Sequence, residues 1–118
     1  MHSFNLRRDT TAKRRELRVQ YLIEAYRRLE DNTGRIEQTP DAYRAFESAV
    51  SDIQLLGTNK QIDALLTFLS QFKDNVDGDI NPLLELIRCD LREELNLEPN
   101  LRQIHQFRFN FNKLTHKS

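Results

Sequence analysis

Apolar residues along this chain recur at intervals of three and four, the spacing that places side chains on one face of an α-helix. Polar stretches and a few Gly and Pro residues divide the pattern into four segments. These segments run from about 10 to 31, 40 to 56, 58 to 73 and 82 to 98. The pattern therefore predicts an all-α, four-helix bundle-like single domain, with its helical core in residues 10–98.

Each predicted helix has an apolar stripe, and together these stripes are the candidate core. The members, in chain order, are Ala12, Val19, Leu22, Ile23, Tyr26 and Leu29; Ala42, Phe46, Ala49, Ile53 and Leu56; Ile62, Leu65, Leu66, Leu69 and Phe72; and Leu84, Ile87, Leu91 and Leu95.

The start of the second and third helices is marked by capping residues. Thr39 can accept a hydrogen bond from the first turn, and Pro40 follows it, where a missing N–H costs nothing. We expect Gly57 to end the second helix in the left-handed conformation. Thr58 and Gln61 have the spacing of a capping box, so the third helix opens at once.

The fourth helix follows a polar loop at residues 74–79. Asn81 is its expected cap, Pro82 its first residue, and Pro99 prevents its continuation.

Both ends of the chain show the two-residue alternation of a strand. In the tail, residues 99–118, Phe107, Phe109 and Phe111 alternate with polar residues such as Arg108. Residues 3–6, within the N-terminal arm of residues 1–8, alternate in the same way. We expect short extended N- and C-terminal segments that could pair as a small ribbon.

Composition narrows the class of protein without identifying a reaction. The single cysteine excludes an internal disulfide and fits a reducing compartment. No apolar run approaches the ~20 residues that a membrane span needs. We therefore expect a cytoplasmic protein with no membrane span in this chain.

Charge is segregated along the chain although the total is zero. Residues 1–35 carry nine Lys/Arg and five Asp/Glu, residues 36–98 carry five and thirteen, and residues 99–118 carry four and none. Basic ends that flank an acidic middle predict contact between them, within one chain or between two. Asp52 and Asp63 are candidate partners for the basic first helix.

The candidate catalytic and metal-binding features are weak. Setting Gly78 at the sixth position of a calcium loop places Lys73 and Leu84 at the two end positions, which need oxygen ligands. Cys89 falls on the polar side of the fourth helix, with no histidine near it in sequence. Three glycines in all leave none of the usual phosphate-binding loops. We expect no catalytic, cofactor-binding or metal-binding residues, and the alternative is an enzyme that uses Cys89 or the acidic loop.

A basic cluster on the first helix supports a second alternative, a nucleic-acid-associated regulator. Arg14, Arg15 and Arg18, with Lys13, could neutralise phosphates. The helical corner at Gly57 has the length of a helix-turn-helix connection, but the following helix offers few base-reading side chains and lies in the acidic part of the chain.

The leading hypothesis is a non-enzymatic protein-interaction or assembly module, either a homodimer or a protein that binds another protein. It follows from the charge segregation and from the Phe-rich tail, whose alternating aromatic residues would form an aggregation-prone edge unless another surface covered them. Phe107, Arg108, Phe109 and Phe111 are the candidate interaction residues, together with the arginines of the first helix.

Three stretches carry a resemblance: RRELRVQYLIEAYRRLE at 14–30, FESAVSDIQLLGT at 46–58 and DLREELNLEP at 90–99, followed by a tail with Arg and Phe. They resemble a group of small uncharacterised bacterial helical proteins, for which no activity is assigned. Members of that group often carry an apolar segment ahead of the basic helix, which this sequence lacks. If the natural chain begins upstream of Met1, the resemblance implies an anchored protein whose basic helix lies beside the anionic cytoplasmic leaflet.

Overall fold

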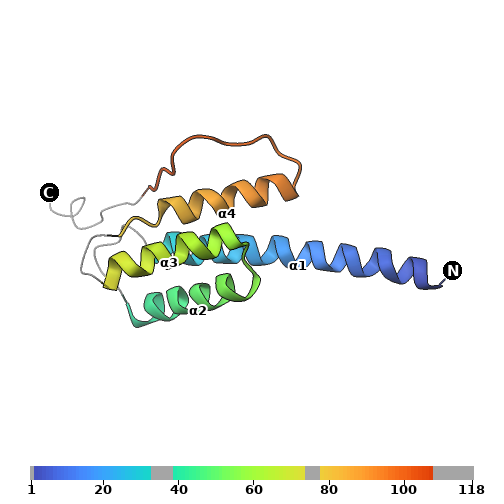
Figure 1. The fold of residues 1–118 in the computed structure, drawn as a ribbon, viewed down its shortest axis with the longest axis horizontal. Coiled ribbons are helices and arrows are strands. Elements are labelled where there is room, and N and C mark those ends of the chain that lie inside the picture. Colours follow the sequence, from blue (N-terminus) through green and yellow to red (C-terminus); the bar gives the residue numbers. More distant parts are fainter. Residues whose placement is uncertain (1, 33–38, 74–77, 108–118) are drawn as a thin grey trace, which may run out of the picture.

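Four α-helices make up the fold in the computed structural model, which describes residues 2–32, 39–73 and 78–107. They are α1 (His2–Asn32), α2 (Pro40–Leu56), α3 (Asn59–Lys73) and α4 (Asn81–Glu94). Helix α1 contacts α2 and α4, and α3 contacts the same two helices. These contacts place α1 and α3 at opposite corners of the bundle. The prediction of an all-α, four-helix bundle-like domain is confirmed (Figure 1).

Helix α1 is much longer than its neighbours. It has 31 residues, whereas α2, the next longest helix, has 17 residues. Its N-terminal part therefore projects beyond the other three helices (Figure 1). Every side chain from Thr10 to Leu17 is exposed there.

The prediction of an extended segment at residues 3–6 is wrong, because α1 already begins at His2. Residues 2–9 contain neither Gly nor Pro, and extending a helix that has already formed costs little. A two-residue alternation over only four residues is too short to outweigh that propagation.

The core lies between the four helices and is made of aliphatic side chains with one tyrosine. Its buried members are Tyr21, Leu22, Ala25, Leu29, Ala49, Ile53, Leu65, Ile80, Leu83, Leu84 and Ile87. The predicted stripe of α1 is therefore split. Leu22 and Leu29 face the core, but Ala12 is exposed and Val19 and Ile23 are half-buried on a different face.

The corner between α2 and α3 has both predicted caps. Thr39 Oγ1 accepts from the amide of Ala42 at 3.1 Å, and the capping box joins Thr58 and Gln61 through two bonds of 3.2 Å. Gly57 is not left-handed as predicted, since its φ is −76°. A Cβ atom there would lie 2.5 Å from the carbonyl oxygen of Ile53, so glycine is required for close approach and not for its conformation.

The outer side of α3 differs from its predicted stripe. Leu66 and Phe72 are 50% and 69% exposed, and Leu56 at the end of α2 is 49% exposed. Gln61, which the predicted stripe did not include, is buried instead, with only 1% of its surface exposed. Phe68 packs edge-on against Phe46, with ring centroids 5.9 Å apart.

Helix α4 starts and stops at residues other than those predicted. Asn81 lies inside the helix, and its amide donates to the carboxylate of Asp79 at 3.0 Å. The helix ends well before Pro99, and the turn that follows it contains Asn96, whose φ of 56° is left-handed. The amide of Leu97 donates to the carbonyl of Arg92 at 2.8 Å, and that of Asn96 to the carbonyl of Glu93 at 3.1 Å. These two bonds make a Schellman motif.

The segment after α4 turns back and runs alongside that helix (Figure 1). Arg88 donates to the carbonyls of Asn100 and Arg102, and Ile104 packs against the core. Residues 103–107 form no strand, and the side chain of Phe107 is 74% exposed. The rest of the predicted C-terminal strand lies outside the described residues. The predicted ribbon is wrong, because the N-terminal segment that would pair with this strand is part of α1.

The left-handed turn at Asn96 generates a matched pair of substitutions. Asn96→Gly should leave the free energy of unfolding within about 0.5 kcal/mol of wild type, since glycine adopts this conformation freely. Asn96→Ala should lower it by about 1 kcal/mol, because a Cβ without a local hydrogen-bonding group is strained there. Urea denaturation followed by far-UV circular dichroism measures both, and equal stabilities would contradict this account of the helix end.

Candidate interaction surface on the first helix

A polar junction joins α1, α3 and α4 at the edge of the core. Asp90 on α4 accepts a hydrogen bond from Gln61 Nε2 at 2.8 Å and another from Arg18 Nη2. The side chain of Asp90 is only 17% exposed. These donors therefore replace water around the carboxylate. Hydrogen bonding to Asp90 in turn raises the pKa of Arg18, which keeps its charge.

Gln61 extends the junction to the corner between α2 and α3. Its Oε1 accepts from the amide of Thr58 at 3.2 Å and, at 3.5 Å, from the hydroxyl of Tyr21 on α1. Burial of this phenol raises the pKa of Tyr21 to about 12. One amide side chain therefore links the cap of α3 to both α1 and α4.

Ion pairs beside this junction and on the other side of α1 join basic residues of α1 to acidic residues of α2 and α4 within one chain. Arg18 Nε donates to Glu94 Oε1 at 3.1 Å, and Arg15 Nε lies 3.6 Å from Glu94 Oε2. On the other side of α1, Arg28 Nη2 donates to Asp52 at 2.7 Å. The predicted contact between the basic first helix and Asp52 is confirmed. Asp63 is exposed on α3.

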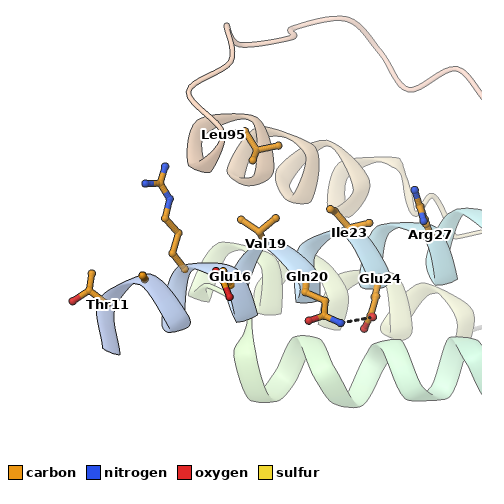
Figure 2. Close-up of a pocket in the computed structure, with 10 residues that line it drawn as sticks. Thr11, Glu16, Val19, Gln20, Ile23, Glu24, Arg27 and Leu95 are labelled. Carbon is orange, nitrogen blue, oxygen red and sulfur yellow. Dashed lines mark hydrogen bonds between the residues drawn. The ribbon is translucent and has the colours of Figure 1, made fainter. Parts of the chain in front are cut away.

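The outer face of α1, turned away from α3, carries an open hollow of about 990 Å³. Val19 and Ile23 point from α1 toward the side on which Leu95 lies beyond the end of α4 (Figure 2). Gln20 and Glu24 point to the other side and are joined by a hydrogen bond of 3.2 Å. The hollow's lining is completed by Thr11, Ala12, Arg15, Glu16 and Arg27.

The predicted interaction residues that the structure describes do not gather at one place. Arg14 is exposed on α1, while Arg15 and Arg18 are engaged by carboxylates of α4. The segment that leads to Phe107 runs back along α4, away from the end at which Glu94 pairs with Arg15 and Arg18 (Figure 1). Arg108, Phe109 and Phe111 lie outside the described residues.

The sequence contains a signal for this surface, because the apolar stripe of α1 is too wide to face one core. On a helix, Ile23 lies about 100° away from Leu22, so both could not face the same core. An apolar stripe this wide indicates either two packing surfaces or an element buried on all sides.

The described residues offer little support for a catalytic thiol, a metal site or a membrane span. Cys89 is an exposed thiol on α4. Within residues 2–32, 39–73 and 78–107, no group of three His, Cys, Asp or Glu side chains could hold a metal ion. None of the helices in the described parts of the chain is long and apolar enough to span a membrane.

We compared the chain with protein-family models, curated protein sequences and solved structures, and found no match.

The junction at Asp90 predicts that Arg18 contributes more to stability than Arg15, which lies one turn away on α1. Arg18→Met removes a charged donor from a shielded carboxylate and should lower the free energy of unfolding by about 1–3 kcal/mol. Arg15→Met is the matched control, since its side chain is 57% exposed. Such an exposed pair contributes about 0–1 kcal/mol. Equal losses in urea denaturation would contradict the junction's role.

The raised pKa of Tyr21 predicts a loss of stability at alkaline pH. Above about pH 10 the unfolded chain loses the phenolic proton while the folded chain keeps it. The free energy of unfolding should therefore fall as the pH rises toward about 12, the pKa of Tyr21 in the folded chain. Tyr21→Phe should make the dependence of the urea midpoint on pH shallower in this alkaline range. Tyr43→Phe, at an exposed position, is the control and should keep the wild-type slope. A Tyr21→Phe slope equal to wild type would contradict the prediction.

Proposed function

We propose that this chain is a non-enzymatic protein-interaction module that binds a helix of its partner along the outer face of α1. The observation that carries the proposal is the open hollow of about 990 Å³, with Val19 and Ile23 at its centre and Leu95 at its edge. Large apolar side chains at the rim of a folded domain are typical of binding surfaces when they are contiguous.

A helix fits this surface better than a strand or a loop. The hollow follows α1 along its length, and Ala12, Val19 and Ile23 all line it. Their seven- and four-residue spacing is that of a helical packing seam. The hollow offers side chains and no free backbone edge, so an added strand would find no ladder to extend. Helix-in-groove binding uses apolar anchors at this spacing.

The partner is a second copy of the chain or another protein, in a cytoplasmic setting. The ring of Phe107 is exposed. Its exposure favours a further contact made by the tail, in line with the assembly role expected from its sequence.

Nucleic acid is a less suitable partner for this chain. Of the three arginines that such a role would use, Arg15 and Arg18 face Glu94 and Asp90. These carboxylates compete with phosphate for the same donors. Arg14 alone among the three has an exposed side chain without such a carboxylate pairing among the described contacts.

The enzyme alternative rests on the thiol of Cys89, which is exposed on α4. A nucleophilic thiol needs a base within hydrogen-bond reach. Among the described contacts, none places a base beside it.

Helical fragments displayed from the genome that encodes this chain test the proposal. Purified wild-type chain should select fragments whose binding is lost in the double variant Val19→Gln, Ile23→Gln. Both residues are half-buried outside the core. Glutamine is a good helix former and should leave the fold intact.

A control variant with Leu66→Gln changes an exposed apolar residue on α3 and should keep the same binders. Circular dichroism and thermal denaturation check that all variants are folded. Binders that tolerate the α1 substitutions, or no selected binder at all, would count against an interaction surface on α1.

A further inference from the structure

We infer that the helix which occupies the outer face of α1 is α1 of a second copy of this chain, packed antiparallel across a two-fold axis. The inference rests on the proposed function, because it names the partner of the same surface. It is carried by the order of apolar and charged residues along α1, which is self-complementary in one direction only.

The seam that faces outward consists of residues at spacings of four, three, four and four. In order they are Ala12, Glu16, Val19, Ile23 and Arg27, all of which line the hollow. Such spacing keeps side chains on one face, as in the seam of a two-helix coiled coil.

A two-fold axis that crosses α1 at the level midway between residues 21 and 22 brings Val19 and Ile23 of the two copies together. Because one residue advances a helix by about 1.5 Å, Val19 of one copy lies within a single residue's rise of Ile23 of the other copy. The reverse contact follows by symmetry, since a two-fold interface uses the same patch twice. Leu95 beside Val19 adds apolar surface at the edge of each contact.

The same axis sets opposite charges against each other. Glu16 and Arg27 are at equal distances on either side of the axis, so Glu16 of each copy lies level with Arg27 of the other. Both side chains are exposed in the single chain. A parallel arrangement would instead place Glu16 against Glu16 and Arg27 against Arg27, and like charges at such positions disfavour pairing.

The rest of the bundle leaves room for this packing. Helices α2 and α4 contact α1 on the sides toward α3, so the outer face is the one that a second helix can approach. The two bundles would then lie on opposite sides of the paired α1 helices.

Charge reversal tests the pairing directly, with mass measured by light scattering and sedimentation at about 10–300 µM, a range that covers weak interfaces. Wild type should dimerise. Glu16→Arg and Arg27→Glu should each raise the dimer dissociation constant about tenfold, because each creates two like-charge contacts. The double variant Glu16→Arg, Arg27→Glu should return it to within about threefold of wild type.

Glu47→Arg and Lys60→Glu, at exposed positions on α2 and α3, are matched controls that should not change the dissociation constant. A chain that stays monomeric overturns the self-pairing. The self-pairing is also overturned if the double variant dimerises no more tightly than the single variants. It is likewise overturned if the charge reversals leave the dissociation constant unchanged and the dimer dissociates only in the triple variant Phe107→Ser, Phe109→Ser, Phe111→Ser. Any of these results leaves the proposed function to its own test, because fragment binding that depends on Val19 and Ile23 does not require a dimer.

Discussion

The position of α1 in this protein depends on Asp90, a shielded carboxylate of α4 that accepts hydrogen bonds from Arg18 on α1 and Gln61 on α3. A carboxylate removed from water is stable only where donors surround it, so the three helices have to meet in an arrangement that supplies both. Because Gln61 also closes the cap of α3, the same arrangement fixes the corner that follows α2. One buried amide and one carboxylate thus link α1, α3, α4 and the corner that follows α2, beside the apolar core that the helices share.

That arrangement gives α1 two faces with different roles. The face that holds Leu22 and Leu29 is buried against the bundle, while the face that holds Val19 and Ile23 remains open along a helix that outruns its neighbours. Arginines on either side of α1 form ion pairs with carboxylates of α2 and α4. Three basic residues of α1 are therefore paired with the acidic part of the chain inside the fold. The surface left for a partner is apolar at its centre, with one acidic and one basic residue in the same seam.

Two of the three expected helix caps, each formed by residues within one turn of one another, are present, whereas the third, Asn81, lies inside α4. Thr39 before Pro40, and Thr58 with Gln61, set helix starts as expected. A cap satisfies amides of its own first turn and needs no other part of the chain. Signals at helix ends were less reliable. Gly57 is extended and Asn96 is left-handed, because close approach and chain direction there depend on what packs nearby.

The sequence by itself determined that this chain is helical, where its polar breaks fall, and that its basic first helix would meet acidic side chains. Only the tertiary structure decided which apolar residues are core. Periodicity assigns residues to a helix face but does not say how many neighbours that helix has, so the stripe of α1 could not be divided between Leu22 inside and Val19 outside. The buried place of Gln61 was equally hidden, because a polar residue enters a core only when partners from other helices are brought to it. Here those partners are Asp90 and Tyr21.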